Sequence, residues 1–124
     1  GAVQRQHDPD WLPNGEIGIL NNRMSRDFSE IVSIDPDSFE RTTILDGREI
    51  DFYTRVRGKH QPLGNGGLVV TSPQQGRAFE LSREGDIVFE IANQKPESDT
   101  TNYIISEMRW LPPSMFDLGE WECR

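Results

Sequence analysis

The fold of this chain is decided by one stretch near its start, QHDPDWLPNGEIGILNN (residues 6–22). Two strand-like runs flank the turn Pro13-Asn14-Gly15, and asparagine followed by glycine is the strongest short-range signal for a β-hairpin because both residues tolerate positive φ. A similar stretch, KHQPLGNGGLVVT, occupies residues 59–71. The two stretches lie roughly 50 residues apart, a spacing typical of large structural repeats. They predict a β unit that occurs twice.

Each unit is expected to hold four antiparallel strands. After the first hairpin, residues 30–34 (EIVSI) read as a third strand with Val32 and Ile34 on one face, and residues 41–45 read as a fourth. Between them, residues 35–38 (DPDS) combine a proline that presets φ with aspartates that accept backbone hydrogen bonds, which predicts a turn. The second unit repeats this order, with strands expected over residues 68–71, 77–81 and 86–91.

The predicted organisation is one all-β unit over residues 1–124, with two repeats and one extra strand. The repeats cover about residues 5–47 and 51–93, and the terminal strand covers about residues 102–111. Repeats of about 40 to 50 residues with four strands each are typical of β-propeller blades, of which a closed ring needs roughly 4 to 8. The pattern therefore predicts an incomplete propeller or a fragment, completed by the remaining blades of a longer chain or by other copies of itself.

A different arrangement of the same strands is possible. A single β-sandwich or open barrel would use eight or nine short strands of this kind. In that case the chain would be a small β domain that associates through its exposed sheet edges.

The bulk composition excludes some classes of function. The chain has 124 residues, 34% of them hydrophobic, a formal net charge of −8 and a mean hydropathy of −0.66. Such an acidic balance has no basic footprint for nucleic acid. No apolar run approaches the roughly 20 residues that a membrane span needs. The single cysteine, Cys123, cannot form an internal disulfide, and no metal-binding spacing, phosphate-binding glycine loop or serine-elbow motif predicts a cofactor.

Several short motifs together resemble the C-terminal part of the arylsulfotransferase family, whose members are β-propellers. The resemblance spans about residues 5–113 and implies a β-propeller fold, sulfuryl transfer between phenols and an extracytoplasmic or periplasmic location. The motifs are Gln6-His7, Ile19-Leu20-Asn21-Asn22, Ser33-Ile34-Asp35, Asp51-Phe52-Tyr53, Gly76 to Leu81, Gly85 to Glu90, and Tyr103 to Trp110 before the prolines.

The resemblance also implies roles for individual residues. Bacterial members carry one histidine that is transiently sulfated, while other histidines and arginines bind the sulfuryl oxygens. His7 is similar to an oxygen-binding histidine, and the basic residue that follows it corresponds to Arg23 or Arg26. We expect His7 and Arg23 at the catalytic site, with Arg26 and His60 binding a phenolic sulfate. The nucleophilic histidine is expected in the corner of residues 72–76 (SPQQG), which holds none.

The chemistry of sulfuryl transfer suits these side chains. The group spreads negative charge over its oxygens, so fixed histidine and arginine donors stabilise it. His7 and His60 each precede a hairpin, which predicts that both point toward one central funnel. The structural alternatives are histidines that cap strands and arginines that solvate a loop. The sequence thus predicts an arylsulfotransferase-like propeller of doubtful transfer activity; the alternative is a non-catalytic binding or scaffolding module.

Overall fold

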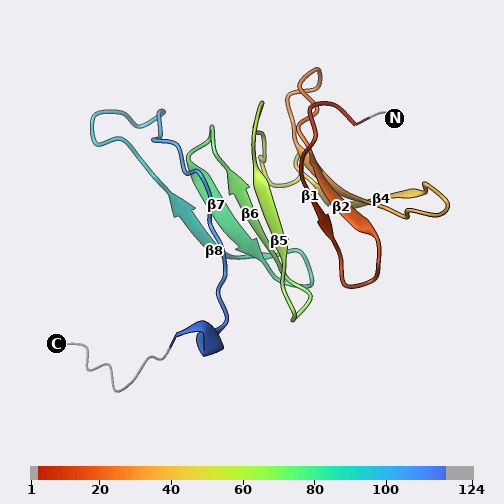
Figure 1. Ribbon diagram of the computed structural model, residues 1–124. Helices are drawn as coiled ribbons and strands as arrows, with labels where there is room; N and C mark the ends of the chain where they lie inside the picture. The colour runs from red at the N-terminus through yellow and green to blue at the C-terminus, as the bar shows by residue number, and fades with distance from the viewer. Residues whose placement is uncertain (1–2, 117–124) are drawn as a thin grey trace.

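The computed structural model describes residues 3–116, and its regular secondary structure is almost entirely β-strand (Figure 1). Sheet one consists of β1 (His7–Trp11), β2 (Ile17–Asn21), β3 (Glu30–Ile34) and β4 (Arg41–Asp46). Sheet two consists of β5 (Lys59–Pro62), β6 (Leu68–Ser72), β7 (Arg77–Leu81) and β8 (Ile87–Ala92), and the 3₁₀ turn η1 (Pro113–Met115) follows. Each sheet is antiparallel with its strands in sequence order. The predicted all-β fold of two four-stranded repeats is confirmed.

The arrangement is open. Within residues 3–116 the two sheets form neither a closed ring nor a barrel. An open arrangement of this kind is consistent with a partial propeller. Over the same residues, no helix has the length and apolar character that would let it cross a membrane.

Both hairpins are held by the same pattern of backbone hydrogen bonds. In the first, the N–H of Leu12 donates to the Glu16 carbonyl and the N–H of Gly15 donates to the Leu12 carbonyl. In the second, Leu63 bonds to Gly67 and Gly66 bonds to Leu63 in the same pattern. Gly15 and Gly66 have φ values of 85° and 88°, a conformation that favours glycine, so the turn sequence dictates the hairpin.

The core lies between the two sheets. Phe52, on the link between them, meets Phe79 edge to face with ring centroids 5.8 Å apart. Burial of these apolar side chains is the main force that holds the sheets together. The core residues come from sheet one (Leu20, Ile31, Leu45), from sheet two (Leu68, Val70, Phe79, Leu81) and from the link (Phe52).

Rows of paired residues occur at equivalent positions in the two sheets. Residues that pair directly across neighbouring antiparallel strands share a face. In sheet two the row Val70–Phe79–Glu90 turns toward sheet one, and its first two members are core residues. The matching row of sheet one is Ile19–Val32–Thr43, and it turns away from the core. We call this side the outer face of sheet one.

Sheet two has an outer face as well, on the side opposite the core. Two rows lie on it, and they match the rows of sheet one that pack into the core. The rows are Lys59–Thr71–Ala78–Ile91 and Gln61–Val69–Glu80–Phe89.

The end of the described chain differs from the strand that its pattern predicts. Residues 102–111 contribute only an isolated bridge, between Gln94 and Asn102. The following segment, blue in Figure 1, runs along sheet two toward η1. Its backbone bonds to side chains of Gln61 and Thr71, which lie on the outer face of sheet two. A segment laid over a face cannot form a ladder, because ladder hydrogen bonds lie in the plane of the sheet.

Candidate functional site

The predicted arginines Arg23 and Arg26 line one groove, beside the end of sheet one where β2 leads into the corner. The groove has a volume of about 400 Å³. It gathers four guanidinium groups and two carboxylates within a chain whose net charge is −8. The charged residues that line it are Arg23, Arg26, Arg41, Arg48, Glu30 and Asp46. We call it the arginine groove.

Glu30 is the anchor of the groove. Its side chain is only 5% exposed, and one carboxylate oxygen, Oε1, accepts hydrogen bonds from Asn21 Nδ2 and Arg23 Nε, each at 2.7 Å. Arg41 pairs with the same oxygen through Nη2. Arg41 reaches it from the position paired with Ile34, so its stem passes along the outer face over Val32, which is fully buried. A buried carboxylate with several charged donors is well compensated and fixes the positions of both arginines.

Phe28 supplies the aromatic side of the groove. The guanidinium carbons of Arg23 and Arg48 lie 5.4 Å and 4.8 Å from its ring centroid. Arg48 also pairs with Asp46, and the hydrogen bonds from its side chain lower the pKa of Asp46 to about 2. Stacking on the ring and pairing with carboxylates hold these two guanidinium groups in place.

Arg26 differs from the other three arginines. It is exposed, and its guanidinium has no hydrogen-bond or ion-pair partner among residues 3–116. Its backbone N–H donates to the Arg23 carbonyl at 2.8 Å, which closes a turn and presents the side chain at the mouth of the groove. An unpaired guanidinium beside three held ones gives the groove a surplus of positive charge. Such a site suits an oxyanion that accepts several hydrogen bonds.

His60 lies elsewhere, between the two sheets. Its side chain is 0% exposed, and its Nε2 faces Gly18 of β2, where a Cβ would come within 2.7 Å. Asp8 of β1, in sheet one, binds β5 of sheet two, the strand that carries His60. Asp8 accepts hydrogen bonds from the His60 N–H at 2.7 Å and Lys59 Nζ at 2.8 Å, and its Oδ2 lies 3.2 Å from His60 Nδ1.

This contact ties the first strands of the two sheets together. Burial alone would raise the pKa of Asp8, but the hydrogen bonds from His60 and Lys59 outweigh it and hold that pKa well below the usual 3.8. The same pairing raises the pKa of Lys59. The charged pair of Asp8 and Lys59 therefore joins the sheets, and the buried ring of His60 lies between them.

The predicted equivalence of His7 and His60 is wrong. His7 pairs with Leu20, whereas His60 pairs with Val70, which matches Ile19 of sheet one. The two histidines are thus one register position apart, and side chains at adjacent positions of a strand point to opposite faces. The cause is the irregular register of β1 between His7 and Asp10, where Asp8 has a φ of 54°. His7 is half-buried at the start of β1, and neither histidine lines the arginine groove.

Other residues of the arginine groove carry no signal that sequence reasoning could use. Arg41 lies within a strand, and Arg48 follows an Asp-Gly turn, so neither stands out beside the long corner that holds Arg23 and Arg26. Their approach depends on the pairing of β3 with β4. Asp8 does stand out as a residue beside His7, but its partners lie in the other sheet.

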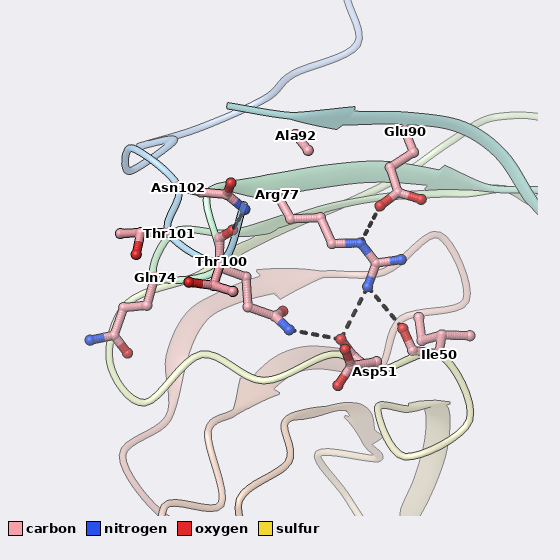
Figure 2. Close-up of a pocket in the computed structure, with 10 residues that line it drawn as sticks. Ile50, Asp51, Gln74, Arg77, Glu90, Ala92, Thr100, Thr101 and Asn102 are labelled. Atoms are coloured by element: carbon pink, nitrogen blue, oxygen red, sulfur yellow. Dashed lines mark hydrogen bonds and ion pairs between the residues drawn. The ribbon is translucent and has the colours of Figure 1, made fainter. Parts of the chain in front are cut away.

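A second groove matches the first in register. It has a volume of about 620 Å³ and lies between the link and sheet two (Figure 2). Its residues Arg77, Glu90 and Ala92 occupy the positions that Glu30, Thr43 and Asp46 occupy in sheet one. Arg77 crosses to sheet one's side and donates to the carbonyls of Ile50 and Asp51 at 2.8 Å and 3.1 Å, while it pairs with Glu90.

Comparison with known proteins assigns the strands to one family model. The model described as Arylsulfotransferase (ASST) matches residues 1–94, a range that includes all eight strands and the arginine groove. No curated protein and no solved structure matches the chain.

Proposed function

Because the chain belongs to the arylsulfotransferase (ASST) family, we propose that its arginine groove binds the sulfuryl oxygens of a phenolic sulfate. Arg23 and Arg26 are the residues for which the family resemblance implies this role. One observation carries the proposal: Arg26 presents an unpaired guanidinium, within residues 3–116, beside an Arg23 that Glu30 holds in place. Guanidinium groups donate pairs of hydrogen bonds in a geometry that tetrahedral oxyanions accept.

The Phe28 ring supports the choice of an aryl ester. The ring borders the groove, and the guanidinium groups of Arg23 and Arg48 lie over it. An aryl group of the ligand would find an apolar neighbour there while its sulfuryl oxygens meet the arginines. The groove thus has a part for each half of a phenolic sulfate.

Binding without transfer is the function that we favour for this part of the fold. In place of a nucleophile, the corner after β6 has a structural glutamine. Gln75 Oε1 accepts hydrogen bonds from Ser72 Oγ at 2.6 Å and from the Tyr53 N–H at 3.1 Å. These contacts tie the corner to the link, and the corner holds no histidine. His7 keeps its proposed role as an oxygen-binding residue only if a ligand reaches the start of β1.

Titration calorimetry with 4-nitrophenyl sulfate tests the binding. Saturable binding is expected, and Arg26→Gln should weaken it about tenfold because one charge-assisted donor is lost. The matched control is Arg83→Gln, which removes an exposed arginine from the β7–β8 turn of the other sheet. Equal affinity of Arg26→Gln and the unaltered chain would overturn the proposal.

The same ligand separates the binding function from catalysis. Transfer to a phenol acceptor releases 4-nitrophenolate, which absorbs visible light. Binding without release is the result that a non-catalytic module predicts. Release that is lost in His7→Ala would instead favour a transferase in which His7 takes part.

A further inference from the structure

The segment after β8 covers the outer face of sheet two, whose counterpart in sheet one packs against another sheet. The outer face of sheet two carries Thr71, Ala78 and Ile91 where sheet one carries Leu20, Ile31 and Leu45, its core-forming row. In sheet one that row receives Val70 and Phe79 of the next sheet. The matching face of sheet two receives a single crossing segment instead.

Residues 103–111 form this crossing segment, which we call the strap. Three hydrogen bonds hold it on the face. The Met108 N–H donates to Thr71 Oγ1 at 2.9 Å, the Trp110 N–H donates to Gln61 Oε1 at 2.9 Å, and Gln61 Nε2 donates to the Trp110 carbonyl at 3.0 Å. The side chains of Gln61 and Thr71 point out of the sheet. These bonds therefore hold the strap above the face and do not use the backbone groups through which β5 and β6 pair.

The strap covers the face incompletely. Phe89 and Ile91 of β8 remain 52% and 47% exposed, and they line open pockets of about 250 and 430 Å³ together with Met108 of the strap. Single exposed apolar side chains are common, but a contiguous apolar strip on a sheet face marks an interaction surface. The outer face is therefore closed at Val69, Thr71 and Ala78, which are at most 2% exposed, and remains open along β8.

We propose that a second copy of this chain docks on the outer face of sheet two, through its own outer face of sheet one, when the strap is displaced. The occupant follows from the internal repeat. The outer face of sheet one carries the row Ile19–Val32–Thr43, in which Ile19 and Thr43 reach the surface and Val32 is fully buried. This row matches the row of sheet two that already packs against a face of this type. Docking would continue the stacking of sheet two on sheet one from one molecule into the next.

Charge and space both agree with this occupant. The outer face of sheet two carries Glu80, and the outer face of sheet one carries Arg41, whose guanidinium also pairs with Glu30. Docking need not close the arginine groove, because the matching groove beside Arg77 stays open at the interface within the chain (Figure 2). The same contact between unlike faces can repeat, so the assembly would be head-to-tail. This inference depends on the interface between the sheets and not on sulfuryl binding.

The test releases the strap without altering either sheet. Met108→Pro removes the N–H that bonds to Thr71, because proline has no backbone donor. The matched control is Ser106→Pro, at a strap residue whose N–H has no hydrogen-bond partner among residues 3–116. Hydrogen exchange at Trp110 reports whether the strap is released, and sedimentation velocity reports the oligomeric state.

The expected result is faster exchange at Trp110 and concentration-dependent self-association of Met108→Pro, with neither change in Ser106→Pro. Adding Ile19→Arg, on the docking face and outside the lining of the arginine groove, should return Met108→Pro to a monomer, whereas Ser38→Arg in the β3–β4 turn should not. A monomeric Met108→Pro with a released strap would overturn the proposal, as would an assembly that Ile19→Arg leaves intact. Unchanged exchange at Trp110 would show that the strap is not held as proposed. Affinity for 4-nitrophenyl sulfate, measured in parallel, keeps this outcome separate from that of the arginine groove.

Discussion

Gly18 of β2 lies directly against the imidazole of His60, so that a Cβ on Gly18 would come within 2.7 Å of His60 Nε2. The missing side chain leaves the room that the histidine ring occupies between the sheets. We therefore expect Gly18→Ala to force the sheets apart and to lower the free energy of unfolding by about 1 to 3 kcal/mol. Urea denaturation measures the change.

A control and a second variant make this prediction specific. Gly64→Ala adds the same methyl group where nothing lies within 4 Å, and it should leave stability nearly unchanged. Removing the ring with His60→Ala should relieve part of the effect of Gly18→Ala in the double variant, while the approach of the new Cβ to Leu12 Cδ2 at 2.8 Å remains. A Gly18→Ala chain as stable as Gly64→Ala would show that the ring moves freely between the sheets.

Asp8 makes the contact between the sheets dependent on pH. Its pKa is lower in the folded chain than the ordinary 3.8, so its contribution to stability is complete above that value and is lost as the pH falls through the folded pKa. Asp8→Asn should lower stability by about 1 to 2 kcal/mol at pH 7. The difference between Asp8→Asn and the unaltered chain should narrow as the pH drops below 3.8.

The pH series needs an aspartate that makes no such contact. Asp37 is exposed, and Asp37→Asn should run parallel to the unaltered chain at every pH. A difference between Asp8→Asn and the unaltered chain that is constant from pH 7 to pH 3 would contradict the assignment.

Glu30 separates stability from ligand binding in the arginine groove. Glu30→Gln removes the charge that Arg23 and Arg41 share, and it leaves two guanidinium groups near a neutral, buried side chain. We expect a loss of about 2 to 4 kcal/mol of stability. Affinity for 4-nitrophenyl sulfate per folded molecule should not fall, because the amide oxygen can still accept from Arg23 Nε while the surplus of positive charge increases. Thermal unfolding and calorimetry of Glu30→Gln beside Glu84→Gln, an exposed control, check both parts.

Arg77 tests the contact between sheet two and the link. Its guanidinium donates to two carbonyls, pairs with Glu90 and stacks over Phe79 with 4.7 Å to the ring centroid. Arg77→Lys keeps the charge but cannot make this set of bonds, so we expect a loss of about 1 to 2 kcal/mol. Chemical denaturation gives the number, and Arg55→Lys, at an exposed position of the link, is the control. Equal stability of the two lysine variants would refute a structural role for the guanidinium fork.

The strands could be predicted because their signals are local. Alternating apolar residues bounded by turns placed β3 and β7 at their observed bounds, and Asn-Gly turns placed both hairpins. Arg23 and Arg26 share a groove because both lie in one corner, which the sequence also indicates. Local signals therefore reach as far as one hairpin and its adjoining corner.

The rest of the site depends on relations between distant residues. The irregular register of β1 places His7 and His60 at different register positions, and no residue type near Asp8 predicts this irregularity. Arg41 joins the groove through the pairing of β3 with β4. The strap lies on the outer face of sheet two, although its sequence pattern predicts a further strand. Each of these features depends on tertiary pairing, which a propensity or a motif does not encode.

Glu30 and Arg77 occupy matching register positions on the two sheets and carry opposite charges. A stack of copies would therefore contain two kinds of seam in alternation. The seam inside each chain has a guanidinium bound directly to carbonyls, whereas the seam between chains would have a carboxylate already surrounded by guanidinium groups. Attraction between charges across the second seam is screened as the Debye length shrinks from about 10 Å at 0.1 M salt to about 3 Å at 1 M. Rising ionic strength should therefore divide the stack into intact two-sheet units, so that the pair of sheets, and not the single sheet, is its building block.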